Sequence, residues 1–380
     1  MIELSEELKM VREQTRRFVD REAIPREMEL EEADAVPPDI VAKLRELGYF
    51  GIKTPEKYGG LGLGLVGYCV VQREFGRTHP AINLIISGNN SIGAMGILND
   101  GTEEQKQKYL PRLAKGELIA ALALTEPDAG SDAAAISTHA EKKGDRWIIN
   151  GMKHFITRGN IADIYTVMAV TDKEKRARGG ITAFIVEKDA PGLVVGNLQR
   201  SMGSDTVGQA EIFFEDCEIP EENVIGEVGR GFRVVMKVLE DGRIGQGARA
   251  LGAAERLLEL STDWAKQRMQ FGKPISERQA IQWMLVDMAR DIYATECMVF
   301  DAATLKDAGE RIPRKASIVK LFASEMAFRA ADSALQIHGG TGYMKESPVE
   351  FFFRELRLLR IIEGTNEIQR LVISREILKE

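Results

Sequence analysis

One carboxylate in the sequence stands in a position that suits proton-transfer chemistry. Glu363 follows the apolar run LLRII and precedes Gly364, within the segment 358–370 (LLRIIEGTNEIQR). If the side chain turns back to water beside the start of the next helix, the helix dipole lowers its pKa. If it is kept away from water, burial raises the pKa and makes the carboxylate a stronger base. The residues alone favour the first explanation, and Thr365 or Asn366 is the expected N-cap of that helix.

Two further segments have compositions that suit ligand binding. Residues 124–135 (LTEPDAGSDAAA) combine small residues with hydroxyl groups at Thr125 and Ser131, so backbone N–H groups can approach an anion or a flat ring closely. An ordinary Pro-Asp-Ala-Gly turn has the same composition. Residues 265–282 break a helix at FGKP and place Arg268 before the break. The arginine fork suits a pyrophosphate, although a solvated helix end is the simpler interpretation.

A glycine-rich segment follows another predicted helix. Residues 336–350 (QIHGGTGYMKESPVE) contain three glycines, at positions 339, 340 and 342. They allow close backbone approach to a ligand, or a helix C-cap followed by a turn. The sequence SPVE at 347–350 predicts a new helix with an N-cap, a proline at its first position and a capping box. His338 is expected to be packed or to cap a helix rather than to bind a ligand.

The surrounding pattern predicts helices, then strands, then helices. The helical period dominates to about residue 116, with Ser5 as an N-cap and Thr102 and Gln105 as a capping box. The GxGxxG pattern at 62–67 lacks the preceding strand that a dinucleotide-binding loop needs, so we interpret it as a loop before a helix. Runs rich in β-branched and aromatic residues predict strands within 146–157, 163–172, 179–189 and 210–219. From residue 232 long amphipathic segments typical of a helical bundle return.

Composition narrows the class of protein. The chain has 380 residues, 44% hydrophobic and 29% charged, with a net charge of −7 and no long run of one sign, which disfavours nucleic acid as the main partner. Three separated cysteines and four scattered histidines predict neither a disulfide framework nor a metal site. The N-terminal segment lacks the apolar core of a signal peptide, and no apolar run approaches the ~20 residues of a membrane span. We therefore expect a cytoplasmic protein.

Five phrases of the sequence, in this order and spacing, resemble the acyl-CoA dehydrogenase family over essentially the whole chain. They are LTEPDAGSD, NGMKHFIT, RMQFGKPI, QIHGGTGY and IIEGTNEIQR. The resemblance implies an α+β fold with an N-terminal helical domain (1–120), a central antiparallel β-barrel domain (121–228) and a C-terminal four-helix bundle (229–380), in a homotetramer. It also implies bound FAD, oxidation of an acyl-CoA to the trans-2-enoyl-CoA, and electron transfer to an electron-transfer flavoprotein.

The resemblance also implies roles for individual residues. Glu363 matches the catalytic base, which removes the α-proton while the β-hydride passes to flavin N5. The implied cofactor-binding residues are Leu124, Thr125, Gly130, Ser131, Phe155, Thr157, Arg268, Gln270, Gln336, Gly339, Gly340, Thr365 and Glu367, with the adenine side coming from a neighbouring subunit. The implied substrate contacts are Ser131, Asp241, Arg243 and Gly364. The backbone N–H of Glu363 and a ribityl hydroxyl of FAD would polarise the thioester carbonyl.

The chain departs from the family pattern at a few positions. Ile362 stands where many relatives have an aromatic residue, Phe155 replaces a common tryptophan, and Glu355 stands where Asp is more usual. Some members carry the base in the segment that matches 241–243, an arrangement that the glycine at 242 disfavours. The alternative functions are an oxidase, a flavin-dependent elimination, decarboxylation or enoyl-CoA reduction on the same scaffold, and a non-catalytic helical scaffold.

Overall fold

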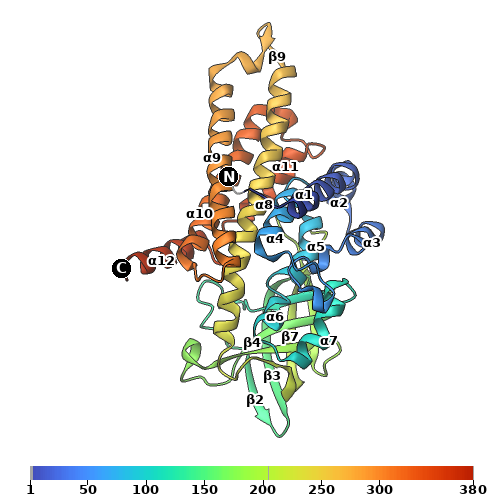
Figure 1. The fold of residues 1–380 in the computed structure, drawn as a ribbon, viewed down its shortest axis with the longest axis vertical. Helices are drawn as coiled ribbons and strands as arrows, with labels where there is room; N and C mark the ends of the chain where they lie inside the picture. The colour runs from blue at the N-terminus through green and yellow to red at the C-terminus, as the bar shows by residue number, and fades with distance from the viewer. Residues whose placement is uncertain (1–2, 204, 380) are drawn as a thin grey trace.

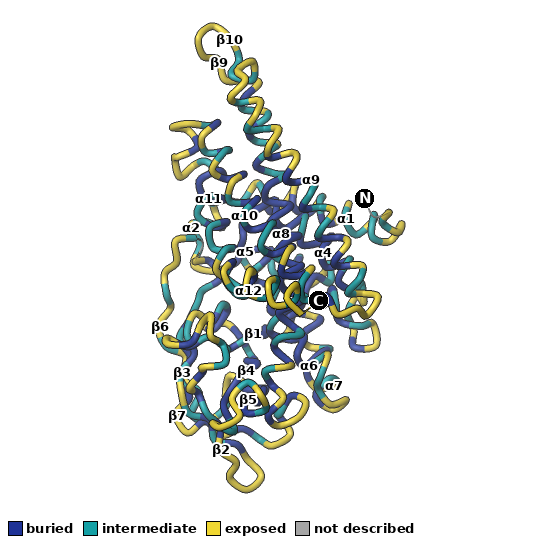
Figure 2. Tube along the Cα trace, turned by 90° about the vertical axis from the view of Figure 1, so that its left-hand side faces the viewer, coloured by how far each residue is buried: buried dark blue, intermediate teal, exposed yellow. Residues whose placement is uncertain are grey.

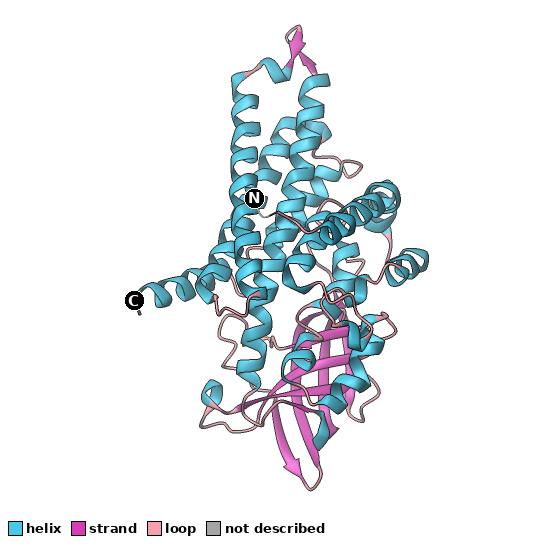
Figure 3. Cartoon of the chain, viewed as in Figure 1, coloured by secondary structure: helices cyan, strands magenta, loops and turns pink. Residues whose placement is uncertain are grey.

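The computed structural model describes residues 3–203 and 205–379. A β-sheet forms one end of the molecule, and long helices rise from it to the other end (Figure 1). The short N-terminal helices pack along one side of these long helices (Figure 3). Helices, strands and helices therefore follow one another along the chain, as the sequence pattern predicts.

Short helices make up the N-terminal region. They are α1 (Glu6–Phe18), α2 (Glu27–Glu32), α3 (Pro38–Glu46), α4 (Gly64–Phe75), α5 (Pro80–Asn90), α6 (Met95–Asp100) and α7 (Glu103–Ala114). Ser5 caps α1, and Thr102 and Gln105 form the predicted capping box of α7. The element before the GLGLVG loop is a 3₁₀ turn, Glu56–Tyr58, and the loop leads into α4. It therefore lacks the strand–loop–helix context of a dinucleotide-binding loop.

The central region is one mixed β-sheet. Its strands are β1 (Ala120–Ala123), β2 (His139–Lys143), β3 (Arg146–Thr157), β4 (Ile164–Val170), β5 (Ile181–Glu187), β6 (Leu193–Gln199), β7 (Gln209–Pro220) and β8 (Val224–Ile225). The order is β6-β7-β3-β2-β4-β5-β8, with β1 also paired to β4. The two ends of this path, β6 and β8, are not paired with each other, so the sheet stays open instead of closing into the expected barrel. Most pairs are antiparallel, but β1 and β2 both pair with β4 in parallel.

The C-terminal region consists of α8 (Gly231–Gln267), α9 (Gln279–Asp307), α10 (Pro313–His338), α11 (Pro348–Leu358) and α12 (Asn366–Ile377). The helix α8 ends four residues before the expected break at FGKP, because the chain turns back as a small hairpin. Its strands are β9 (Met269–Gln270) and β10 (Lys273–Pro274), joined by Phe271 and Gly272 at φ of 51° and 76°. Ser347 caps α11 with Pro348 at its first turn, as predicted. The capping box does not form, because Glu350 pairs with Arg354.

Three hydrophobic clusters hold these regions together. The largest joins the N-terminal helices to α8, α9 and α10 and includes Phe75, Leu251 and Ala327. A second lies between α6, α7, the sheet and the start of α8, and a third lies within the β region around Phe184 and Phe214. Figure 2 shows the buried chain concentrated where α4, α5, α8 and α10 meet, whereas the tips at β9–β10 and β2 are exposed.

The segment Pro80–Asp100 corrects the expectation that no apolar run approaches the length of a membrane span. Pro80–Asp100 is long and apolar enough, by length and composition, to span a membrane. In the structure α5 and α6 divide this segment, and 83% of its apolar window is buried inside the protein. Ile82 and Ile86 from this segment belong to the largest hydrophobic cluster. Its apolar character therefore serves packing in the core.

Candidate functional site

Glu363 lies in the short loop between α11 and α12. Both Glu363 (φ 54°) and Gly364 (φ 88°) have left-handed backbone conformations, which for a non-glycine residue persist only where the surroundings impose them. Three side chains hold the carbonyl groups of this loop. Gln369 donates to the carbonyl oxygens of Glu363 and Gly364 at 3.2 and 2.7 Å, Lys320 donates to that of Gly364 at 2.9 Å, and Arg243 donates to that of Glu363 at 3.4 Å.

The strained loop directs the Glu363 carboxylate against α8. A methyl group at position 242 would lie 2.2 Å from Glu363 Oε2, so only glycine leaves room for the carboxylate there. Gln246, one turn further along α8, donates from Nε2 to Glu363 Oε1 at 3.2 Å. The second oxygen, Oε2, is buried and has no hydrogen-bond partner among the described residues.

Burial dominates the electrostatics of this carboxylate. Burial raises the pKa of Glu363, against the opposing effects of the Gln246 hydrogen bond and of the charges of Arg243, Lys320 and Arg249. The same dry surroundings lower the pKa of Lys320 to about 8. The geometry therefore matches a base kept away from water, and not a carboxylate whose pKa is lowered at a helix start.

The other residues expected to contact the substrate or the cofactor near Glu363 do not all lie at its carboxylate. Asp241 pairs with Lys53 at 2.7 Å and lies 3.5 Å from Lys306 Nζ, so its charge is already balanced by side chains of the protein. Thr365 caps α12 by accepting from the backbone N–H of Ile368 at 3.3 Å. The exposed Glu367 lies in the first turn of that helix. Of the expected substrate contacts, Gly364 lies in the Glu363 loop and Arg243 contacts this loop.

The loop that follows β1 is fixed by a buried ion pair that the sequence analysis missed. Lys153 on β3 contacts Glu126 at 2.7 Å and also donates to the carbonyl oxygen of Leu124 at 3.1 Å. Burial lowers the pKa of Lys153 to about 8. Burial would raise the pKa of Glu126, but Lys153 and the hydrogen bonds from Ser137 and Thr138 outweigh it and lower the pKa to about 2. The signal for this pair is a lysine at an inward-facing position of a predicted strand.

The expected flavin-side residues lie around this fixed loop. Thr125 accepts a hydrogen bond at 2.8 Å from the backbone N–H of His154, which ties the loop to β3. Phe155 lies at a bulge of β3, has φ 57°, and is 56% exposed. Gly130 and Ser131 are exposed on the loop, and Thr157 is half-buried at the end of β3. An exposed aromatic ring beside hydroxyl groups and a rigid loop fits a flat ring system such as the flavin of FAD.

A second group of expected cofactor residues lies at the end of the bundle farthest from the sheet. Arg268 and Gln270 follow the end of α8, whereas Gln336, Gly339 and Gly340 lie at the end of α10; all five are exposed. The two helix ends meet where Trp264 stacks on His338 with ring centroids 5.3 Å apart. His338 is therefore a packed residue, as expected.

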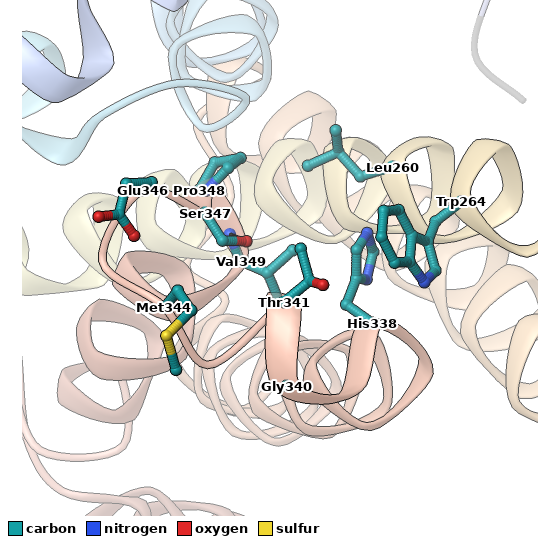
Figure 4. A pocket seen from close by; sticks show the side chains of 10 residues that line it. All are labelled: Leu260, Trp264, His338, Gly340, Thr341, Met344, Glu346, Ser347, Pro348 and Val349. Atoms are coloured by element: carbon teal, nitrogen blue, oxygen red, sulfur yellow. Dashed lines mark hydrogen bonds between the residues drawn. The ribbon is translucent and has the colours of Figure 1, made fainter. Parts of the chain in front are cut away.

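These helix ends border a cavity of about 680 Å³, shown in Figure 4. Gly340 and Thr341 line it together with Trp264 and His338. Most of the expected cofactor residues thus fall into two groups, one around the loop after β1 and one at the ends of α8 and α10, while Thr365 and Glu367 lie at the start of α12. Among the described residues, no group of three or more His, Cys, Asp or Glu side chains is arranged to hold a metal ion.

Comparison with known proteins agrees with this architecture. Models of the N-terminal, middle and C-terminal domains of acyl-CoA dehydrogenase match residues 5–117, 121–217 and 229–378. The chain is 44% identical over 375 residues to an acyl-CoA dehydrogenase of Bacillus subtilis (strain 168), with 99% of each chain covered. It is 40% identical over 377 residues to the caffeyl-CoA reductase-Etf complex subunit CarC of Acetobacterium woodii, again with 99% of each chain covered.

A solved structure extends the match to three dimensions. The butyryl-CoA dehydrogenase of Megasphaera elsdenii superposes with a TM-score of 0.96 at 37% identity, over 100% of both chains. The three domain models together cover most of the chain, and the relative from Bacillus subtilis is 44% identical over nearly the full length of both chains. The chain therefore belongs to the acyl-CoA dehydrogenase family of FAD-dependent flavoprotein oxidoreductases.

Proposed function

We propose that this protein oxidises an acyl-CoA thioester to the trans-2-enoyl-CoA, with Glu363 as the base that removes the α-proton. One observation carries the proposal: Glu363 is half-buried, its Oε2 is buried without a hydrogen-bond partner among the described residues, and this burial raises its pKa. An α-proton beside a thioester is weakly acidic, so a carboxylate removes it only where exclusion of water has strengthened the base.

The backbone of the same residue supports a second role. Within the described part of the chain, no backbone carbonyl group outside the regular helices and strands accepts a hydrogen bond from the Glu363 N–H. We infer that this N–H donates to the thioester oxygen, where negative charge develops as the α-proton leaves. The fixed loop geometry would then set the distance between the base and the thioester carbonyl group, because the carboxylate and the N–H that holds the carbonyl oxygen belong to one residue.

We infer that FAD lies against the loop after β1 and the exposed end of β3. Leu124, Thr125, Phe155 and Thr157 would line the flavin, and Gly130 and Ser131 would lie near the flavin or the CoA arm. Bound FAD supplies the acceptor for the hydride that leaves the β-carbon. The chain's own part is to hold the acyl group between the base and the flavin, so that the α-proton faces Glu363 and the β-hydrogen faces the hydride acceptor, and to exclude water.

The two separated groups of expected cofactor residues support assembly of the site from two subunits. Arg268, Gln270, Gln336, Gly339 and Gly340 would bind the pyrophosphate and adenine of FAD held by a neighbouring chain. An exposed apolar face on α9, with Trp283, Val286 and Tyr293 each more than 60% exposed at helical spacing, supports contact with another copy. We propose a homotetramer on these grounds, as expected from the resemblance.

We propose an electron-transfer flavoprotein as the electron acceptor, and a cytoplasmic location. The similarity to the caffeyl-CoA reductase-Etf complex subunit CarC supports such a partner. The same relative favours a second candidate function, reduction of an enoyl-CoA, in which Glu363 would return a proton to the α-carbon. Burial of the apolar segment Pro80–Asp100 supports the location.

The first experiment is an anaerobic titration of the purified yellow protein with a panel of saturated acyl-CoA thioesters. Bleaching of the flavin absorbance by one thioester would support the dehydrogenase direction. A protein that no saturated thioester bleaches, but whose reduced form is reoxidised by an enoyl-CoA, would favour the reductase direction. A colourless protein that cannot be reconstituted with FAD would contradict both.

A substitution then tests the base. Glu363→Gln should keep FAD and bind acyl-CoA, yet lose flavin reduction by roughly 10²-fold or more, since general-base catalysis contributes on that scale. Normal reduction by substrate in this variant would contradict the assignment of Glu363.

A further inference from the structure

Two positions of α8, one helical turn apart, contact the Glu363 carboxylate. Gly242 leaves the space that the carboxylate occupies, and Gln246 supplies its hydrogen bond, from Nε2 to Oε1 at 3.2 Å. Two atoms at this contact have unused hydrogen-bonding capacity. Gln246 Oε1 and Glu363 Oε2 are both buried, and neither has a hydrogen-bond partner within residues 3–203 and 205–379.

The cations near the carboxylate are engaged elsewhere. Arg243 and Lys320 donate to backbone carbonyl groups of the loop, and Arg249 pairs with Glu355. They affect Glu363 through their charges, each of which lowers its pKa less than the amide hydrogen bond does. Among the described side chains, the group that hydrogen-bonds to the carboxylate is therefore a neutral amide.

A neutral amide suits a base that changes its protonation state in every turnover. A cation in direct contact would favour only the ionised carboxylate. A glutamine amide carries a donor and an acceptor, so its N–H₂ group holds the carboxylate, and its carbonyl oxygen can accept from the carboxylic acid after the amide turns over. Gln246 Oε1 has no hydrogen-bond partner among the described residues, so it is available to accept that second hydrogen bond.

We propose that Gln246 is a positioning residue for Glu363, whose amide holds the carboxyl group against α8 in both its ionised and its protonated form. This inference rests on Glu363 being the base of the proposed function. It adds a residue that sets where the base lies and at which pH the base is ionised. Removing the amide should displace the carboxyl group and destabilise its ionised form more than its protonated form.

The test compares two variants that each remove one amide from the same loop. Gln246→Met removes the hydrogen bond to the carboxylate while keeping the length of the side chain. Gln369→Met is the matched control, because Gln369 bonds only to the carbonyl oxygens of Glu363 and Gly364. If Gln246→Met does not retain FAD, Gln246→Leu takes its place.

Infrared spectroscopy measures the ionisation of Glu363 without turnover. The carbonyl stretch of its protonated form, identified as the band missing from Glu363→Gln, is titrated in the FAD-bound proteins. We expect the midpoint to rise by about one pH unit in Gln246→Met, because a hydrogen bond to a charged group is lost. The midpoint should move much less in Gln369→Met, because Gln369 contacts the backbone carbonyl groups and not the carboxylate, and the thermal stability of that variant should fall.

The pH profile of flavin reduction by acyl-CoA gives the second measurement. Because the base acts in its ionised form, the half-maximal pH should rise by the same amount in Gln246→Met, with roughly tenfold slower reduction at low pH and recovery at high pH. Equal midpoints in the wild type and Gln246→Met, or an equal shift in Gln369→Met, would overturn the inference. A shifted infrared midpoint in a protein that no thioester reduces would support the contact and refute the proposed function.

Discussion

Substituting Gly242 by alanine should slow flavin reduction strongly while leaving the protein folded. The added methyl carbon would lie 2.2 Å from Glu363 Oε2, 2.9 Å from its Cδ and 3.1 Å from its Oε1. Ordinary van der Waals contact begins at 3.4 Å, so the carboxylate has to move by about 1.2 Å. A displacement of that size between a base and its proton costs on the order of 10²-fold in rate. The movement also breaks the hydrogen bond from Gln246.

Stability should change little in this variant, because two effects oppose each other. Alanine in a helix interior is favoured over glycine by roughly 0.5–1 kcal/mol. Crowding in a packed site costs typically about 1–3 kcal/mol, but here the crowded group is the end of a side chain in a loop. We therefore expect a net loss of no more than about 2 kcal/mol.

Two measurements on the same preparations separate these effects. Stopped-flow recording of flavin bleaching by acyl-CoA gives the rate, and thermal unfolding gives the stability. Gly96→Ala in α6 is the control, since the nearest atom to its added methyl is Val234 Cγ1 at 3.3 Å; both its rate and its stability should stay close to the wild type. A wild-type bleaching rate in Gly242→Ala, or an equal loss in both variants, would refute the reasoning.

Three other perturbations test the rest of the site. Lys153→Met leaves the Glu126 carboxylate buried without its partner, so denaturant titration should show a loss of about 3–5 kcal/mol, largely recovered in Lys153→Met/Glu126→Met. The native pKa of Glu126 is about 2, against 4.5 in the unfolded chain. The stability that its carboxylate contributes is therefore complete above the unfolded pKa and is lost as the pH falls toward the native pKa. Acid titration of Glu126→Gln should therefore show a smaller loss of stability than the wild type. Arg268→Met should weaken FAD binding by roughly 10–100-fold when the apoprotein is titrated with FAD, whereas Lys266→Met, at an exposed neighbour, should have little effect; equal affinities for FAD in Arg268→Met and the wild type would argue against a pyrophosphate contact.

Local patterns predicted the elements whose signals lie within a few residues. The capping box of Thr102 and Gln105, the N-cap at Ser347 and the strand at 146–157 all depend on neighbours in the sequence, and the structure confirms them. The strands β2 (HAEKK) and β6 (LVVGNLQ) were missed. The strand β2 is short and mostly charged, and β6 is only half-buried or exposed. They are strands because β2 pairs with β3 and β6 pairs with β7, and not because of their own composition.

The sequence by itself determined that Glu363 sits at the end of an apolar run, beside a glycine that permits a sharp turn, and that Thr365 or Asn366 caps the next helix; the structure selects Thr365. It could not decide between a solvated carboxylate and a buried base. Tertiary structure decided that question, because Gln246 lies 117 residues away along the chain and Arg243 lies 120 residues away. Such contacts leave no periodic or local signal; only the packing of the α11–α12 loop against α8 excludes water from the carboxylate and raises its pKa.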